Sequence, residues 1–517
     1  MSESTHDVTV ETPSGPLRGR SDGSTTRFAG IPFALEPTGE RRFAPPEAVA
    51  DRSEVLDATA FRAVSPQNPS MMDALFGGET EHWSEDCLHL NVWTPDTEPE
   101  VPLPVMVWIH GGGFEMGSGS SPLYDGSSFA RSGVVCVSLN YRLGSLGFLE
   151  LGHLDPAYSG SGNVGLLDQV EALRWVRRNI ASLGGDPDNV TIFGESAGAM
   201  SVSLLMTAPA ARGLFQRAIS QSGALSSAKS SEQARADTDD FMAMGGFTSV
   251  EELRAAPVAD LLAAHAKMSA ERISDPEAVM ARFGSPLAFL PFRPVADGVV
   301  LPTDPLGAMA QGAASGVSLL IGTNLEEWKL FAMMAAPSDT REKLLDRLGL
   351  LTEDPGGALA AYETDHPEAS PAEMEIAFMT DFVFRMPAEA MVAAQVDHSA
   401  VWQYRFDWQS PAFDGMLGAS HALEIPFVFD LVSDHRLHVL VGPEAPEHLA
   451  HSMHEAWVSF ARDGKPVYAD VDWPERGAAD HRVLVLDLDS RVLEDPLNAT
   501  REFWSRQQQA SPNTSAV

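Results

Sequence analysis

Residues 190–200 read Val-Thr-Ile-Phe-Gly-Glu-Ser-Ala-Gly-Ala-Met and contain the pattern Gly-x-Ser-x-Gly at Gly194, Ser196 and Gly198. The bare pattern is common by chance, so its context decides. A β-branched apolar run leads into the pattern and a helix-compatible run leads out of it. Strand, sharp turn and helix in this order form the context of a nucleophile elbow, in which small residues flank a serine on strained backbone. The stretch therefore predicts a nucleophile at Ser196, with a structural serine in a glycine-lined turn as the alternative.

A second glycine-rich segment lies upstream, where residues 108–114 read Trp-Ile-His-Gly-Gly-Gly-Phe directly after a strand-like run. Consecutive glycines at a strand end let backbone N–H groups face a ligand without side-chain obstruction. Acyl transfer needs such donors for its oxyanion, and each is worth roughly 10²–10³ in rate. We expect the amides of Gly112, Gly113 and Ala197 to form an oxyanion hole; a merely flexible loop is the alternative.

A serine nucleophile needs a base and an acid that orients the base. The chain has 15 histidines, and His421 stands out because it follows a strand-like run late in the chain. The acid should lie between serine and histidine in chain order. Glu326 and Glu327 follow the strand-like run 317–321 and are both candidates. Spacing alone does not choose between them.

Alternation of strand-like and helical segments predicts the fold class. Buried-strand patterns occur at 90–93, 105–109, 134–139 and 190–193, with an amphipathic helix at about 167–180 between the last two. Strand, helix and strand in this order imply parallel pairing, so the chain is of the α/β class. Two stretches, at about 226–285 and 338–395, look helical throughout and interrupt the strands. The polar stretch 507–517 is expected to be a disordered tail.

Composition excludes several kinds of partner. The 35 basic and 72 acidic residues give a net charge of −37, which repels nucleic acid and anionic membrane surfaces. Adaptation to salt and a GC-rich genome both fit this excess of acid. Two cysteines, no 18-residue apolar run and an N-terminus without a signal-peptide pattern point to a cytoplasmic protein.

Two motifs suggest a cofactor or a metal, and neither has the required context. Gly160-Ser-Gly-Asn-Val-Gly165 matches the dinucleotide fingerprint, but no strand precedes it. His451-Ser-Met-His-Glu455 is not the zinc pattern HExxH and is better explained as a solvated helix face. We therefore expect no cofactor and no metal.

Further motifs surround the serine: Glu85-Asp-Cys-Leu-His-Leu-Asn-Val-Trp-Thr-Pro95, Asn140-Tyr-Arg142, Gly184 to Gly198 and Gln221-Ser-Gly223. Together they resemble the signatures of the type-B carboxylesterases, the group that includes bacterial p-nitrobenzyl esterases and the cholinesterases. The resemblance implies an α/β-hydrolase fold: a central, mostly parallel mixed β-sheet flanked by helices, with the helical insertions forming a cap over an active-site gorge. It also implies one hydrolase domain over residues 5–506.

The resemblance assigns residue roles as well. It implies Ser196 as nucleophile, His421 as base and Glu327 as acid, with Glu195, Ser222 and Glu326 in support. The segment 288–298 looks like the family's acyl-pocket wall. The candidates for lining the substrate pocket are Phe114, Leu290, Phe292 and Phe331, with ordinary core packing as the alternative. The usual disulfide partner of Cys87 is absent, since Ser65-Pro-Gln67 stands in its place, so Cys87 should be a free, buried thiol.

The function implied is that of a serine carboxylesterase that hydrolyses small carboxylic esters through an acyl-enzyme on Ser196, as a monomer or homodimer. Amide or carbamate hydrolysis by the same residues is the first alternative. A non-catalytic binding protein of the same fold is a remote alternative, because all three triad positions are filled.

Overall fold

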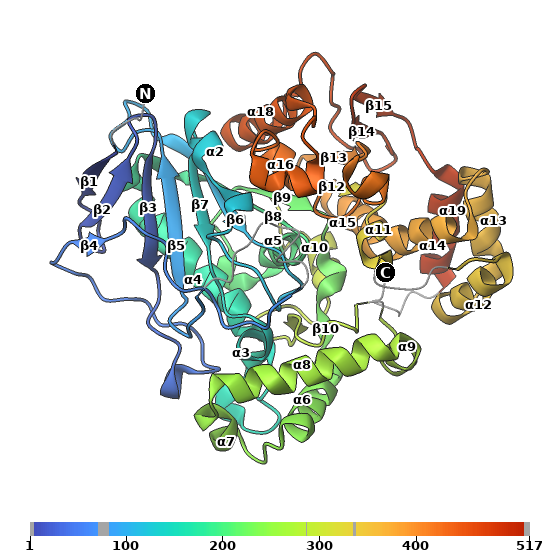
Figure 1. The fold of residues 1–517 in the computed structure, drawn as a ribbon, viewed down its shortest axis with the longest axis horizontal. Helices are drawn as coiled ribbons and strands as arrows, with labels where there is room; N and C mark the ends of the chain where they lie inside the picture. The colour runs from blue at the N-terminus through green and yellow to red at the C-terminus, as the bar shows by residue number, and fades with distance from the viewer. Residues whose placement is uncertain (1–4, 71–81, 286, 334–337, 511–517) are drawn as a thin grey trace.

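The computed structural model describes residues 5–70, 82–285, 287–333 and 338–510. A 13-stranded sheet crosses the molecule in the order β1-β2-β3-β5-β7-β6-β8-β9-β12-β13-β14-β15, with β4 paired to β2 (Figure 1). Antiparallel strands form its N-terminal end: β1 (His6–Val10), β2 (Leu17–Ser21), β3 (Thr26–Pro32) and β5 (His89–Thr94), beside the short β4 (Leu56–Asp57).

The remaining strands pair in parallel, except for the last. They are β7 (Val135–Leu139), β6 (Leu103–Ile109), β8 (Gly185–Glu195), β9 (Arg217–Gln221), β12 (Ser318–Asn324), β13 (Val401–Phe406) and β14 (Val483–Leu486), followed by the antiparallel β15 (Arg491–Leu493). The predicted mostly parallel mixed sheet is thus confirmed. Because parallel strands end at one edge, the loops after β6, β8, β12 and β13 can meet there.

Side-chain alternation along the central strands builds a separate core on each face of the sheet. In β6, Val105, Val107 and Ile109 belong to one core, whereas Met106 and Trp108 belong to the other. The first core contains α4 (Val164–Asn179), α5 (Ala197–Thr207) and α15 (Met386–Gln395), and the second contains α2 (Ser127–Arg131), α16 (Ile425–Val428) and α18 (Glu447–Asp463). Burial on both faces explains why these strands read as continuous apolar runs.

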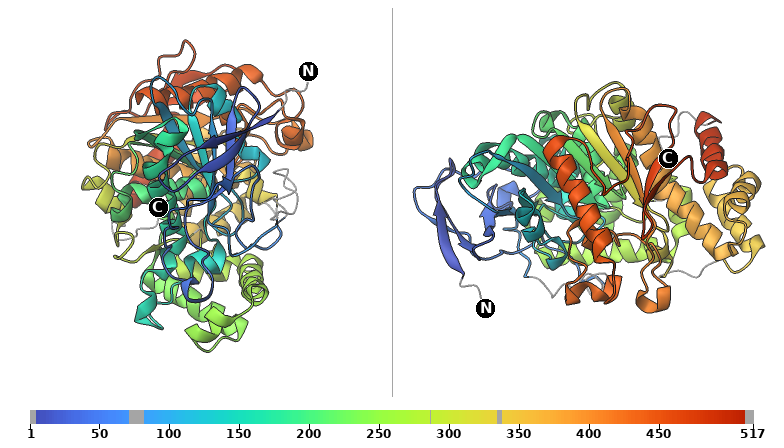
Figure 2. Two further views of the ribbon diagram at one scale, coloured as in Figure 1. Left: turned by 90° about the vertical axis from the view of Figure 1, so that its left-hand side faces the viewer. Right: turned by 90° about the horizontal axis from the view of Figure 1, so that it is seen from above.

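The two stretches expected to be helical insertions are helical. The first holds α6 (Ser231–Gly245), α7 (Val250–Ala255), α8 (Val258–Ser274) and α9 (Pro276–Phe283), which extend below the sheet in Figure 1 and in the left-hand view of Figure 2. The second holds α12 (Arg341–Leu351), α13 (Pro355–Asp365) and α14 (Pro371–Thr380), and continues through a π-helix, η8 (Asp381–Arg385), into α15. Side-chain caps such as the capping boxes of Ser230 and Ser370 fix where α6 and α14 begin.

The C-terminal helix α19 (Asn498–Ala510) corrects the expected tail. Phe503 and Trp504 are buried against α13 and α14 in a third apolar cluster, and this anchor carries the helix over residues 507–510, which were predicted to be disordered. Residues 511–517 lie outside the described residues. Figure 2 shows α19 beside the helices of the second insertion. Among the described residues, no helix is long and apolar enough to cross a membrane.

The N-terminal strand β3 contains an irregularity. Glycine and proline in Gly30-Ile-Pro-Phe-Ala34 are typical of turns and loops, yet Gly30 to Pro32 belong to β3. A register shift between Phe28 and Ile31, with Gly30 at a φ of 69°, accommodates the irregularity inside a paired strand. Glycine and proline signalled a local bulge there, not the end of the strand.

Truncation of Trp504 tests whether α19 holds the second insertion. Trp504 is 2% exposed, and its Nε1 donates to the Tyr362 hydroxyl at 2.9 Å. We expect Trp504→Ala to lower the free energy of unfolding by about 3–5 kcal/mol, because it empties a buried site and removes a hydrogen bond. Urea denaturation measures this change. Arg506→Gln on the same helix, with 65% of its side chain exposed, is the control and should change stability by less than about 0.5 kcal/mol; equal effects of the two variants would contradict the proposed anchor.

Candidate active site

Ser196 lies at the turn between β8 and α5, with φ 55° and ψ −126°. A positive φ is uncommon outside glycine and indicates strain that the surroundings must hold. A Cβ on Gly198 would lie 2.0 Å from the carbonyl oxygen of Ile109, and one on Gly194 would lie 2.6 Å from the same oxygen. Only glycine fits at either position, so the sequence pattern is explained by the close approach of β6.

The loop after β6 meets the same turn. A Cβ on Gly111 would lie 3.2 Å from the Ser196 Cβ, which brings the glycine-rich loop against the nucleophile. Gly112 and Gly113 have φ values of 104° and 63°, and their N–H groups donate to no other described residue. Together with Ala197, the first residue of α5, they are the residues whose amides were expected to form an oxyanion hole.

His421 and Glu327 meet although 94 residues separate them. His421 Nδ1 lies 2.7 Å from Glu327 Oε2. The other oxygen of this fully buried carboxylate accepts the Asn324 N–H at 2.7 Å. The contact fixes the imidazole ring and places its other nitrogen, Nε2, toward the elbow.

Glu326, the alternative that spacing left open, has a different role. Its Oε2 accepts the Ala419 N–H at 3.0 Å, its Oε1 pairs with Lys329 at 2.9 Å, and its backbone N–H donates to the Ala419 carbonyl. Glu326 therefore fixes the loop that carries His421 without touching the imidazole.

Sequence reasoning missed a third buried carboxylate, Glu424. Its Oε2 accepts from Asn324 at 2.7 Å and its Oε1 accepts from Gln221 at 3.1 Å. Gln221 in turn accepts from Trp457 Nε1, and Asn324 also donates to the Ser420 carbonyl. Burial and the charge of Glu327 raise the pKa of Glu424. Its position three residues after His421 was the one sequence feature that could have pointed to Glu424. Nothing else in the sequence distinguished it from the other acidic residues.

Glu195, which precedes the nucleophile, lies on the opposite side of the imidazole from Glu327. Its Oε1 is 3.1 Å from His421 Nε2. Burial raises the pKa of Glu195 well above its ordinary value; the charge of His421 opposes this, and the charges of Glu424 and Glu327 add to it. Burial acts to lower the pKa of His421, but the charge of Glu195 and the hydrogen bond to Glu327 outweigh it and raise that pKa to about 9. The titrations of the two groups are coupled and they compete for one proton. The reason is that Glu195 stabilises the imidazolium of His421 only while its own carboxylate is ionised.

Ser222 supports the site from β9. It is fully buried at φ 57°, and its N–H donates to the Gly322 carbonyl at 2.9 Å. The bond ties the end of β9 to β12, the strand that leads to Glu327. Its hydroxyl is buried without a partner among the described residues.

Of the four residues predicted to line a substrate pocket, two lie at the site. A Cβ on Gly113 would lie 3.1 Å from Leu290 Cδ2, so Leu290 packs over the glycine-rich loop. The Phe331 ring lies 5.2 Å from the imidazole of His421. Phe384, which sequence reasoning missed, lies 4.8 Å from the same ring. It projects from the π-helix η8, and a π-helix is not readable from residue spacing.

The other two residues, Phe114 and Phe292, pack in the apolar core. Phe114 is fully buried 5.1 Å from Phe148, and Phe292 is fully buried between Phe241 and His265. Both rings complete the apolar core, which was the alternative explanation of their sequence pattern.

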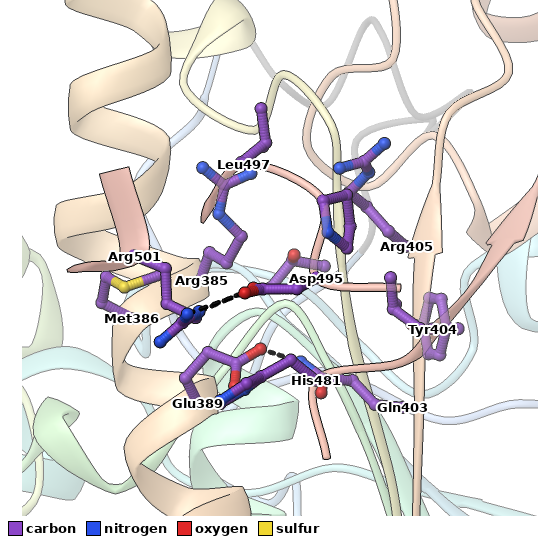
Figure 3. Close-up of a pocket in the computed structure, with 13 residues that line it drawn as sticks. Arg385, Met386, Glu389, Gln403, Tyr404, Arg405, His481, Asp495, Leu497 and Arg501 are labelled. Atoms are coloured by element: carbon purple, nitrogen blue, oxygen red, sulfur yellow. Dashed lines mark hydrogen bonds and ion pairs between the residues drawn. The ribbon is translucent and has the colours of Figure 1, made fainter. Parts of the chain in front are cut away.

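A separate cavity of about 30 Å³ lies between β13, α15 and the chain leading into α19 (Figure 3). Neither Ser196, Glu327 nor His421 lines it. Its lining includes three arginines and two carboxylates: Arg385, Arg405, Arg501, Glu389 and Asp495. Arg501 pairs with Asp495 across the lining, whereas the other three pair with residues behind the walls: Glu389 with Arg476, Arg405 with Asp407 and Arg385 with Asp381. All five of these charges are thus in ion pairs. Within the described ranges, no cluster of three or more His, Cys, Asp or Glu side chains could hold a metal ion.

Comparison with known proteins gives consistent matches along the chain. The model of the carboxylesterase family matches residues 6–504. The para-nitrobenzyl esterase of Bacillus subtilis (strain 168) is 42% identical over 505 residues, which cover 96% of this chain and 98% of that protein. The fumonisin B1 esterase of Sphingopyxis macrogoltabida is 36% identical over 470 residues, covering 88% of this chain and 82% of that protein.

Solved structures agree with the sequence matches. A PNB esterase superposes with a TM-score of 0.84 at 38% identity, covering 96% of this chain and 98% of its own. A Geobacillus stearothermophilus carboxylesterase superposes with a TM-score of 0.84 at 40% identity, covering 96% and 99%.

The contact between Glu195 and His421 gives a pH prediction. A general base must be neutral, so kcat/KM should fall as the pH drops through the pKa of His421. Glu195→Gln removes a charge that favours the imidazolium, so the pKa should fall and the acid limb should move down by about 1–3 pH units. A profile of kcat/KM between pH 5 and 10 measures the shift. The control is Glu326→Gln, which does not touch the imidazole and should leave the midpoint of the acid limb unchanged. If the acid limb of Glu195→Gln did not move either, Glu195 would be uncharged in the wild-type protein over that pH range, which would contradict the prediction.

Proposed function

The chain belongs to the carboxylesterase family and is a carboxylic-ester hydrolase, and from this premise we propose that Ser196, His421 and Glu327 are its catalytic triad. The observation that carries the proposal is the 2.7 Å contact between His421 Nδ1 and Glu327 Oε2, beside the strained turn that holds Ser196. A histidine held by a buried carboxylate, close to a partly exposed serine on a strained turn, is the arrangement that general-base activation requires.

The proposed acylation step uses these residues in order. His421 Nε2 takes the proton of Ser196 Oγ as the oxygen attacks the ester carbonyl carbon. The step requires Ser196 Oγ and His421 Nε2 to come within hydrogen-bond distance when substrate binds, since such catalytic bonds often form fully only in the complex. The amides of Gly112, Gly113 and Ala197 stabilise the tetrahedral oxyanion, and the imidazolium, held by Glu327, then protonates the leaving alcohol.

Deacylation reverses the same roles. Water replaces the alcohol, gives its proton to His421 and attacks the acyl carbon. Collapse of the second tetrahedral intermediate releases the carboxylic acid and returns the proton to Ser196. Each step moves one proton through one imidazole, and none uses a metal or a cofactor.

Leu290, Phe331 and Phe384 are proposed to form the wall that meets the acyl group. Leu290 lies over Gly113 and both phenyl rings lie beside His421. The wall is apolar, which suits uncharged acyl chains better than charged ones. The name of the B. subtilis relative makes p-nitrobenzyl esters the first alcohol group to test.

The wider organisation follows the same proposal. Residues 5–506 would act as one hydrolase domain, with the insertions at 226–285 and 338–395 as its cap. Cys87 and Cys136 are free and buried, which suits a reducing compartment such as the cytoplasm. The net charge of −37 favours small uncharged esters over polyanionic ligands.

Covalent labelling tests the nucleophile. An organophosphonate should label the protein stoichiometrically, and intact-mass spectrometry should show that the label is lost in Ser196→Ala. Hydrolysis of p-nitrophenyl acetate should fall about 10⁴-fold or more in that variant. Ser201→Ala, in the same helix and one turn further on, should keep both label and activity. A wild-type protein that reacts with neither reagent would overturn the proposal.

Faster turnover of p-nitroacetanilide than of the ester would favour the amidase alternative.

Acyl-chain preference tests the proposed wall. Leu290→Ala should open space over Gly113 and raise the ratio of kcat/KM for p-nitrophenyl butyrate over acetate by about tenfold. Phe292→Leu changes a ring that lies in the core, so it should alter both rates equally and leave the ratio unchanged. A ratio that moves in Phe292→Leu but not in Leu290→Ala would assign the wall to the wrong residues.

A further inference from the structure

His265 of the cap helix α8 is buried against the loop that carries the proposed oxyanion hole. The residue is 3% exposed, although its sequence neighbourhood is polar. Its Nε2 lies 3.1 Å from Glu115 Oε2, and its ring meets Phe292 edge-on at 4.5 Å. A Cβ on Gly144 would lie 2.7 Å from the His265 ring, so the imidazole packs directly on the backbone at Gly144.

Both partners of His265 hold the glycine-rich loop. The Glu115 N–H donates to the Gly112 carbonyl at 3.0 Å and so closes the turn that presents the two glycine amides. The Gly144 N–H donates to the Phe114 carbonyl at 2.7 Å. His265 therefore touches the side chain of one loop anchor and the backbone of another.

Two other contacts restrain the loop: the Met116 N–H donates to the Gly112 carbonyl at 3.0 Å, and His110 Nδ1 lies 2.8 Å from the Gly111 carbonyl oxygen. Gly112 and Gly113 offer no side chains, and their positive φ values are open to glycine without cost. Gln67 fixes the far end of the loop, because it accepts the Gly117 N–H at 2.8 Å and donates to the Gly117 carbonyl at 3.1 Å. Near Gly113, the side chain of Glu115 is the polar group that ties the loop to His265 of α8.

The carboxylate of Glu115 faces the imidazole of His265. Within the described residues, His265 is the only basic side chain in ion-pair contact with Glu115, and Ser269 Oγ is 3.5 Å from the same carboxylate oxygen. The other oxygen, Oε1, is buried without a hydrogen bond to a described residue. Without the imidazole, the Glu115 carboxylate, whose side chain is 16% exposed, would keep only the 3.5 Å contact to Ser269 Oγ. It would then move toward water and shift the loop with it.

We propose that His265 is a positioning residue for the oxyanion hole, acting through Glu115 and the Phe114–Gly144 contact, so that the cap completes the catalytic loop. The inference rests on the proposed function, because it takes Gly112 and Gly113 as the oxyanion donors. Donors displaced by a fraction of an ångström stabilise the transition state less but change substrate binding little.

The test separates positioning from folding by a split between kcat and KM. With p-nitrophenyl acetate, His265→Leu should lower kcat about tenfold and leave KM within about twofold, since a misplaced donor costs part of the 10²–10³ of a lost one. The rate of inactivation by the organophosphonate, whose phosphoryl oxygen needs the same donors, should fall in parallel. His265→Gln keeps a donor for Glu115 and should recover most of the loss.

A double-mutant cycle tests the route through Glu115. Glu115→Gln should lower kcat like His265→Leu, and the double variant should be no worse than either single variant, because both remove one contact. Additive losses would overturn the proposed route.

Two controls keep the result unambiguous. Leu261→Ala removes a buried side chain from the same helix without touching the loop, so it should lower Tm but not kcat. Arg282→Gln breaks an exposed cap ion pair with Asp240 and should change neither. A wild-type kcat in His265→Leu, with Ser196 still labelled, would overturn this inference alone. Equal loss of kcat in Leu261→Ala would also overturn it, because any damage to the cap would then suffice. Absence of label in the wild type would overturn the proposed function.

Discussion

The missing side chain at Gly198 is the constraint on which the site depends. It lets the start of α5 approach the Ile109 carbonyl to a distance that a Cβ, 2.0 Å from that oxygen, would forbid. β6 ends at Ile109 and the glycine-rich loop follows it, so the same close approach brings that loop against Ser196. The strained serine and the two glycine amides are therefore consequences of one backbone-to-backbone distance.

Local patterns predicted those parts of the site that backbone geometry dictates. Glycines that cannot be replaced, a serine between them and apolar runs buried on both faces leave signals in adjacent residues, so the elbow, the loop amides and the central strands could be read directly. The partner of His421 could not be read from spacing, because Glu326 and Glu327 are neighbours and only the side-chain directions at the end of β12 separate them.

Other parts lay beyond local patterns for different reasons. Phe384 lies beside His421 and projects from a π-helix, which residue spacing does not reveal. Phe292 packs in the core against His265. Glu424 was hidden among 72 acids. The charge of −37 is a sum over the whole chain, whereas three buried carboxylates, Glu195, Glu327 and Glu424, raise the pKa of one imidazole. Overall charge therefore gave no guide to the electrostatics of the site.

The contact between α8 and the catalytic loop bears on how this scaffold diversifies. Insertions that cover an active site are commonly treated as exchangeable parts whose variation alters substrate choice and leaves the chemistry intact. Here the first insertion carries His265, whose partner Glu115 belongs to the core. Exchanging this insertion between homologues would separate the pair, so positions 115 and 265 are expected to co-vary across the family. The pair would also limit which insertions are compatible with a given hydrolase core.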